Sequence, residues 1–188
     1  MSDSPSPRVD AERNRRLLLD AAAEALARDP DASMGDVAET AGLTRATLYR
    51  HFGSREHLLE ALRADALVSA REAIENSRLD DGSALDALRR VVSAITALGG
   101  KFHPLLANGA DEDPAFLKAR GAVFAPVQRV IQRGQAEHVI RADLSPQWVV
   151  AALTALLSAA VRSRGENAGD DPVFELLAFG LVAPEEKR

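Results

Sequence analysis

The chain has 188 residues and carries 23 lysines and arginines against 28 aspartates and glutamates, which gives a formal charge of −5 at pH 7. This acidic balance argues against wholesale neutralisation of nucleic-acid phosphates, which favours a basic chain. With 46% hydrophobic and 27% charged residues, the composition excludes fibrous, collagen-like and fully disordered proteins. The sequence contains no cysteine, so disulfides and thiolate metal sites are also excluded.

Helical periodicity runs through almost the whole chain, and no pair of strands is evident. Only 4% of the residues are aromatic, and alanine, the best helix former, is abundant, a balance that favours helices over strands. Glycine, proline and aspartate clusters separate segments of helical length. The sequence therefore predicts an all-α fold of about nine helices.

The N-terminus and the apolar segments predict the compartment. The first residues, MSDSPSPRVD, are polar and rich in serine and proline, so we expect a disordered tail over residues 1–9 and no secretory signal. The longest nearly apolar stretch, residues 148–161, falls short of the roughly 18–20 residues that a bilayer span needs. We expect a cytoplasmic protein without a membrane partner.

Capping residues mark the helices of the N-terminal half. Ser33 and Asp36 have the spacing of a capping box, Thr44 and Ser54 can each cap a following helix, and Gly42 suits the end of a helix. The predicted helices cover residues 10–28, 33–41, 45–51 and 54 to about 77. We divide the chain into an N-terminal domain of residues 10–53 and a second domain of residues 54–188.

Residues 33–52 have the pattern of a helix-turn-helix, with a short helix, a turn that contains glycine and a second short helix. Residues 45–55 contain three arginines and no acid, and at a Debye length of about 8 Å a phosphate there would feel these charges more than the distant acids. An ordinary helical corner with a solvated face is the alternative. The outward side chains, which can donate hydrogen bonds to phosphates or base edges, are Arg45, Thr47, Tyr49, Arg50 and His51.

The same segment resembles a known family. LLLDAAAEALA followed by VAETAGLTRATLYRHFGSREHLLEAL resembles the N-terminal DNA-binding domain of the TetR (tetracycline-repressor-like) transcriptional regulators, over residues 14–64. The specific part is AGLTRATLYRHFGSREHLL, in which Gly42, Tyr49 and Phe52 stand where that family places such residues. Gly35 departs from the pattern, because these regulators often have a basic or polar side chain there.

The resemblance implies roles for individual residues of this segment. The first part of the second helix would reach base edges or a nearby phosphate, and its later residues would contact the sugar-phosphate backbone. The capping residues would add phosphate contacts, whereas Leu48 and Phe52 are expected in the core. The implied DNA-binding residues are Ser33, Thr44, Arg45, Thr47, Tyr49, His51 and Arg55.

TetR-like proteins are homodimers, and residues 148–161 give an independent reason to expect one. A helix that is apolar on nearly every face must be covered on all sides, and small residues allow a partner helix to approach closely. A helix buried wholly within one protomer is the alternative. In a dimer, the helix over residues 148–161 and the last helix of each protomer would form a four-helix bundle. The predicted interface residues are Ala151, Ala155, Ser158, Ala159, Phe174, Leu177, Ala178 and Leu181.

The resemblance also implies a small-molecule site in the C-terminal domain. The middle helices offer a mostly apolar lining with a few polar groups, which suits a hydrophobic or aromatic effector. For any single residue of this lining, ordinary core packing is the favoured alternative. His103, beside Pro104 at a helix break, is placed to form a hydrogen bond. The candidate residues are Thr96, Phe102, His103, Phe116, Phe124, Gln128 and Trp148.

Together these patterns predict a ligand-responsive repressor that binds a palindromic operator of double-stranded DNA as a homodimer. The alternative is a small helical enzyme or protein-interaction module in which the helix-turn-helix is incidental. The sequence has no glycine-rich phosphate loop, GxSxG elbow or HExxH motif, and its four histidines lack metal-ligand spacing. We therefore expect no enzymatic activity, no cofactor and no metal.

Overall fold

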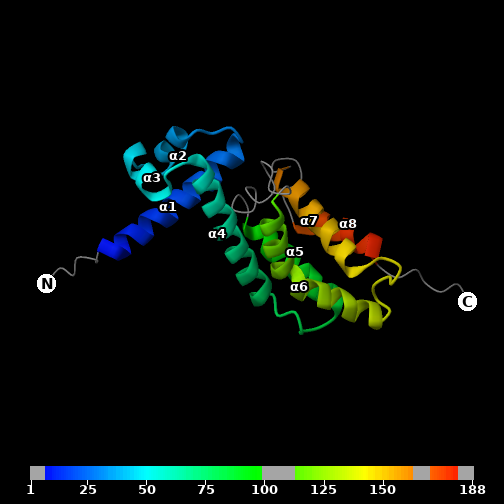
Figure 1. Ribbon diagram of the computed structural model, residues 1–188. Coiled ribbons are helices and arrows are strands. Elements are labelled where there is room, and N and C mark those ends of the chain that lie inside the picture. The colour runs from blue at the N-terminus through cyan, green and yellow to red at the C-terminus, as the bar shows by residue number, and fades with distance from the viewer. Residues whose placement is uncertain (1–6, 99–112, 163–169, 182–188) are drawn as a thin grey trace, which may run out of the picture.

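The structure, a computed structural model, describes residues 7–98, 113–162 and 170–181, which form eight α-helices (Figure 1). The predicted all-α class is confirmed. The sequence predicts about nine helices, and the count of eight refers to the described residues alone, since residues 99–112 and 163–169 lie outside them. No helix within the described ranges is long and apolar enough to cross a bilayer.

The first three helices are α1 (Pro7–Arg28), α2 (Met34–Thr40) and α3 (Arg45–Phe52). The helix α1 begins at Pro7, earlier than the predicted start at Asp10, so residues 7–9 belong to it and not to a tail. The predicted capping box is present, since Ser33 Oγ accepts hydrogen bonds from the backbone of α2 and the Asp36 carboxylate accepts from the Ser33 backbone. The ends of α2 and α3 are therefore decided by local hydrogen bonding, as the sequence indicates.

The long helix α4 (Arg55–Asn76) belongs to two hydrophobic cores. Its first turns contribute Leu58 and Leu62 to a cluster with α1, α2 and α3, whereas Ala66 and Ile74 lie in a second cluster with the later helices. The change from one core to the other thus falls inside α4, between Leu62 and Ala66.

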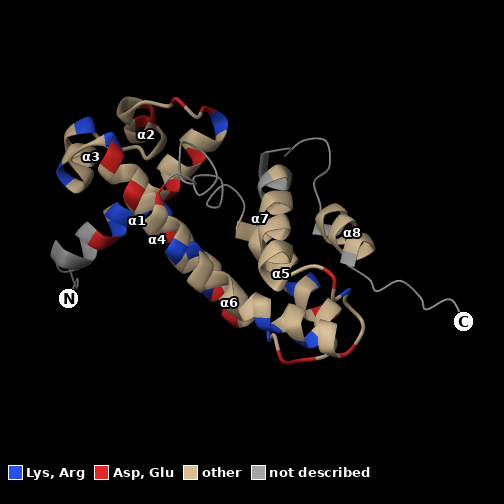
Figure 2. Ribbon diagram, turned by 45° about the vertical axis from the view of Figure 1, so that its right-hand side comes forward, with Lys and Arg blue, Asp and Glu red and all other residues tan. Residues whose placement is uncertain are grey.

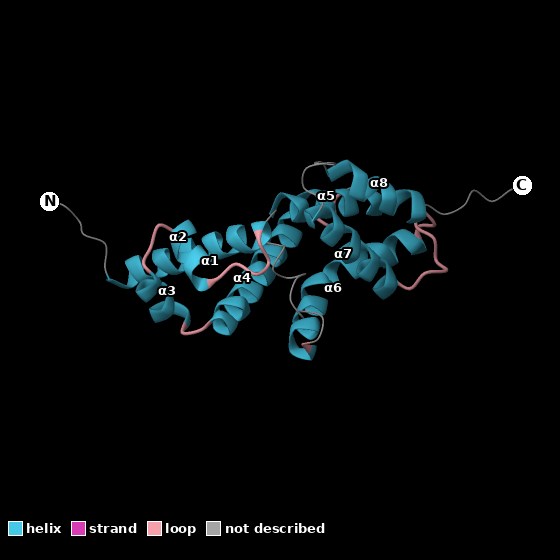
Figure 3. Cartoon of the chain, turned by 90° about the horizontal axis from the view of Figure 1, so that it is seen from above, coloured by secondary structure: helices cyan, strands magenta, loops and turns pink. Residues whose placement is uncertain are grey.

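The second core is built by α5 (Ala84–Leu98), α6 (Pro114–Ala136), α7 (Pro146–Arg162) and α8 (Asp170–Leu181) together with α4. Figures 1 and 3 show an elongated molecule, with α2 and α3 at one end and α7 and α8 towards the other, and α4 between them. The helix α6 continues through Pro126 as a single helix.

Two helical glycines of α6 differ in their surroundings. A Cβ atom added to Gly134 would lie 2.6 Å from Ile140 Cδ1 and 2.8 Å from Ala84 Cβ, whereas one added to Gly121 would have no neighbour within 4 Å. The missing side chain of Gly134 therefore lets α5 and the segment after α6 approach α6 closely.

This difference predicts opposite effects of the same substitution. Alanine in a helix interior is favoured over glycine by roughly 1 kcal/mol, so Gly121→Ala should raise the free energy of unfolding by up to that amount. Gly134→Ala should instead lower it by about 1–3 kcal/mol, because the added methyl overpacks the core. Urea unfolding of both variants checks this, and a Gly134→Ala protein at least as stable as the wild type would contradict it.

Candidate nucleic-acid interface

The helices α2 and α3 form a helix-turn-helix joined by residues 41–44. Gly42 has φ +64°, a left-handed conformation that glycine adopts without steric cost. The Leu43 backbone N–H donates to the Ala38 carbonyl at 2.9 Å, which closes the turn against α2. Because α2 packs on α1 and α3 packs on α4, the pair is fixed at one end of the molecule.

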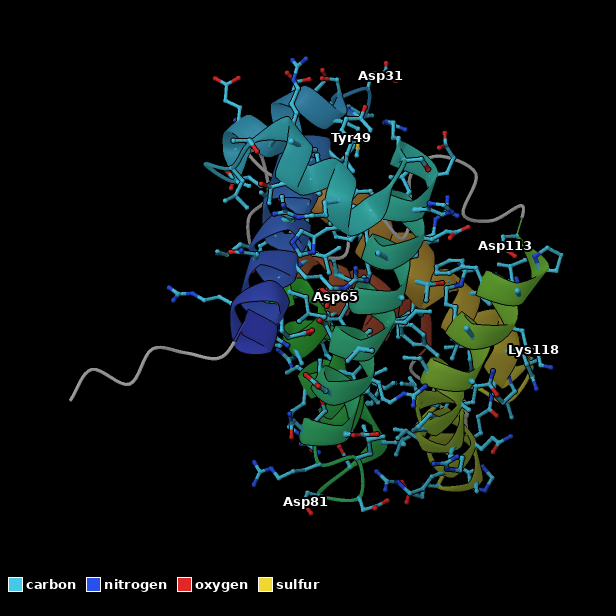
Figure 4. The ribbon with its side chains drawn as sticks, turned by 60° about the vertical axis from the view of Figure 1, so that its left-hand side comes forward. Asp31, Tyr49, Asp65, Asp81, Asp113 and Lys118 are labelled. Carbon is cyan, nitrogen blue, oxygen red and sulfur yellow. The ribbon has the colours of Figure 1, made fainter. Side chains whose placement is uncertain are left out.

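The side chains of α3 divide into a buried and an outer set. Leu48 and Phe52 are 0% and 4% exposed, which confirms their predicted place in the core. Arg45 and Arg50 are exposed, and Tyr49 is 49% exposed, while Thr47 and His51 are half-buried. Figure 2 shows basic segments on α3, and Figure 4 shows Tyr49 at the same end of the molecule as Asp31, far from Asp81.

The hydroxyl groups predicted to bind phosphate already take part in helix caps. Ser33 Oγ donates to Asp36 Oδ2 at 2.7 Å and accepts from the Gly35 and Asp36 backbone N–H groups. Thr44 Oγ1 accepts from the Thr47 N–H at 3.2 Å and lies 3.0 Å from the Thr47 hydroxyl, so one of these two hydroxyls donates to the other. The Ser33 hydroxyl hydrogen is thus engaged, and one hydroxyl hydrogen of the threonine pair remains for an external acceptor.

The same cap perturbs the carboxylate of α2. The hydrogen bond from the Ser33 hydroxyl, followed by the one from the Ser33 backbone, lowers the pKa of Asp36, and the positive charge of Arg45 lowers this pKa further. Asp36 is therefore ionised across the neutral range, and its negative charge complements the positive N-terminal end of α2.

Arg55 has a structural partner that the sequence did not reveal. Its Nη2 donates to the Pro30 carbonyl at 3.0 Å, which joins the start of α4 to the connection between α1 and α2. The two residues are far apart in sequence, so no local sequence pattern predicts this contact. One donor of the predicted phosphate ligand is thus committed to holding the domain together.

Arg15 is a further basic residue at this end of the molecule. Its guanidinium carbon lies 4.9 Å from the centroid of the Phe52 ring, in cation–π contact. The contact brings a positive charge from α1 to the end of α3. The alignment of Arg15 with Phe52 depends on the packing of α1 against the later helices.

The residues predicted to bind a small molecule are only partly brought together. Phe116 and Phe124 lie in the second core, and Thr96 Oγ1 is buried without a hydrogen-bond partner in the described part of the chain. Gln128 is half-buried. Trp148 is 58% exposed on α7, on the outward side of the helix, and so does not line the interior. Phe102 and His103 lie outside the described residues.

The predicted dimer residues also separate into two groups. Ala151, Ala155 and Ala159 are exposed along one face of α7, as the dimer prediction requires. On α8, Phe174 and Leu177 are 6% and 4% exposed and pack into the protomer's own core. Ala178 is half-buried, and nothing is described of the side chains of Ser158 and Leu181.

Other residues of α8 occupy the outward positions. Leu176 and Phe179 are 67% and 86% exposed, and their spacing of three places them on one side of the helix. The exposed apolar face of α8 is thus rotated away from Phe174 and Leu177. An apolar period identifies the helix, but it does not reveal which of two apolar sides meets the protomer core.

Residues 18–62 match the family described as "Bacterial regulatory proteins, tetR family". This segment belongs to the TetR family. The match confirms the predicted resemblance for these residues. The matched residues end at Leu62, where the first core also ends.

Two individual transcriptional regulators extend the comparison. The repressor LfrR of Mycolicibacterium smegmatis is 40% identical over 97 residues, and this match spans about half of each protein, 50% of this chain and 51% of LfrR. The regulator NfxB of Pseudomonas aeruginosa is 27% identical over 138 residues, covering 68% of this chain and 70% of NfxB.

Solved structures match over nearly the whole chain. The structure of LfrR from Mycobacterium smegmatis in complex with proflavine has a TM-score of 0.75 at 27% identity and covers 92% of this chain and 99% of LfrR. The structure of the ketosteroid regulator KstR2 of Mycobacterium tuberculosis has a TM-score of 0.69 at 20% identity. This match covers 90% of this chain and 95% of the KstR2 chain, and it supports the fold alone.

Proposed function

We propose that this TetR-family protein is a cytoplasmic transcriptional repressor that binds a palindromic operator as a homodimer and leaves it when an aromatic small molecule binds. The observation that carries the proposal is α3, an exposed helix whose outer surface is basic and whose ends are held by local caps. Such a helix can enter the major groove as a rigid element, with Arg45 and Thr47 towards base edges or a phosphate.

The distribution of charge along the chain fits DNA binding better than the net charge of −5 does. Residues 17–44 contain six acids and one arginine, whereas residues 45–55 contain three arginines and no acid. Because acidic residues flank the basic residues 45–55 in the sequence, binding to DNA of random sequence should be weak and sensitive to salt. Specific affinity then requires two recognition helices, about 34–36 Å apart, on one face of the duplex.

Tyr49 provides the test of the DNA interface. Its ring is exposed on α3 and makes no contribution to the buried core, so Tyr49→Ala should leave the fold intact. We expect it to weaken binding roughly 10-fold or more, because both protomers of a dimer carry the substitution. Fluorescence anisotropy with a duplex selected from a random library by the wild-type protein measures the effect.

The matched control is Arg71→Ala, which removes an exposed arginine of α4 outside the helix-turn-helix. This variant should bind the selected duplex as the wild type does. Equal affinity of the Tyr49→Ala and wild-type proteins would count against the proposed interface.

The outward faces of α7 and α8 support the homodimer. Trp148, Ala151 and Ala155 follow one side of α7, and Leu176 and Phe179 project from the neighbouring α8. Large apolar side chains exposed to this degree mark interaction surfaces, and small residues between them let helices approach closely. A second copy meets the same surface across a two-fold axis, which is the commonest symmetry of homodimers.

Phe179 tests this interface. Phe179→Glu should convert the dimer into a monomer at micromolar concentration, because two charged groups would have to be buried near the axis. Light scattering coupled to size exclusion measures the mass. Val68→Glu, which changes a 55% exposed apolar residue of α4, is the control and should stay dimeric. A wild-type monomer, or a Phe179→Glu dimer, would contradict the interface.

The second core supports an aromatic effector. LfrR was solved in complex with proflavine, a planar aromatic molecule, and its fold superposes on nearly the whole of this chain. Phe116 and Phe124 offer apolar contact within the second core, and the buried Thr96 hydroxyl lacks a partner in the described residues. A ligand group that bonds to this hydroxyl would relieve an unsatisfied polar atom.

Proflavine is therefore the probe for the effector site. We expect its fluorescence to change on titration with the wild-type protein and the selected duplex to be released as it binds. Thr96→Val, which replaces the hydroxyl with a methyl of similar size, should weaken proflavine binding about 5- to 10-fold without loss of stability. Binding of unchanged strength in this variant would remove Thr96 from the site.

A further inference from the structure

Gly35, in the first turn of α2, borders the side chain of Arg45 from α3. A Cβ atom built on Gly35 would overlap Arg45 Nη2 and would lie 2.7 Å from Arg45 Cζ and 2.8 Å from Arg45 Nε. Real Cβ atoms essentially never approach other heavy atoms so closely. The guanidinium thus occupies the space that any other side chain at position 35 would fill.

The backbone does not require glycine at this position. Gly35 lies within α2, and its φ is not in the left-handed region, unlike those of Gly42 and Gly53. Glycine inside a helix costs roughly 1 kcal/mol relative to alanine. The close approach of Arg45 is the feature of the structure that a larger residue would remove.

The Arg45 guanidinium lies against the first turn of α2, and its hydrogen-bond donors are unused in the part of the chain that the structure describes. Among the described residues, Arg45 makes no hydrogen bond and no ion pair, and its effect on Asp36 is Coulombic. The Asp36 carboxylate is itself engaged by the Ser33 hydroxyl and backbone N–H. Arg45 is therefore placed by contact with α2 and keeps its N–H groups for an external acceptor.

We infer that Gly35 is a positioning residue that holds Arg45 for a contact with a DNA phosphate. The inference rests on the proposed DNA-binding function. In a helix-turn-helix the first helix of the pair crosses the DNA backbone while the second lies in the major groove. A guanidinium folded from α3 onto the first turn of α2 lies on the side of the backbone, so Arg45 binds phosphate and does not read a base.

A double-mutant cycle tests the inference, with Gly35→Ala, Arg45→Ala and the two combined. Binding is measured by fluorescence anisotropy from 50 to 200 mM salt, on the selected duplex and on a shuffled duplex of the same composition. Gly35→Ala should not destabilise the fold, because the clash falls on the far end of a long, flexible side chain. Gly121→Ala, a helical glycine with open space around it, is the matched control.

We expect Gly35→Ala and Arg45→Ala each to weaken binding to both duplexes by a similar factor, roughly 10-fold. The magnitude of the salt slope should fall by about 0.9 for each phosphate that is no longer neutralised. Because Gly35 acts through Arg45, Gly35→Ala should cause no further weakening in the Arg45→Ala background. Gly121→Ala should bind as the wild type does.

Three results would overturn the inference. The first is wild-type affinity of the Gly35→Ala protein, and the second is an undiminished effect of Gly35→Ala when Arg45 is already alanine. The third is weaker binding confined to the selected duplex with an unchanged salt slope, which would make Arg45 a reader of bases. Failure of the wild-type protein to bind any duplex is a separate result, and it would reject the proposed function itself.

Discussion

The burial of one stripe of α4 in two hydrophobic cores is the constraint on which the arrangement of the molecule depends. Leu58, Leu62, Ala66, Ala70 and Ile74 recur every four residues, so they form one row that winds slowly around a single continuous helix. The first two pack against the helix-turn-helix and the last three against α5 and α6. Because α4 belongs to both cores, the proposed release of DNA by an effector would have one continuous helix joining the second core to the scaffold of α3.

At the DNA-binding end, the short helices are stabilised by contacts that leave the recognition surface free. Two-turn helices are marginal alone, and here Ser33 and Thr44 satisfy their first N–H groups while Leu48 and Phe52 anchor them in the core. Arg55 ties α4 to the connection after α1. The basic side chains are thus presented from a rigid base, although the whole chain is acidic.

The elements predicted best are those that depend on neighbours in sequence. The starts of α2, α3 and α4 follow from serine and threonine caps, and the burial of Leu48 and Phe52 follows from the helical period. The predictions that differ from the structure concern which side of a helix is buried. On α7, Trp148 faces outward, and on α8 the exposed pair is Leu176 and Phe179 and not Phe174 and Leu177. Both sides of these helices are apolar, so periodicity could not choose between them.

The sequence by itself determined the helical class, the helix-turn-helix and the basic strip from Arg45 to Arg55, because caps, turns and charge runs are properties of adjacent residues. Tertiary structure alone decided where one core ends within α4, which apolar side of α8 is exposed and that Arg45 lies over Gly35. These features join residues distant along the chain, and their geometry depends on how whole helices pack. Local propensity carries no information about that packing.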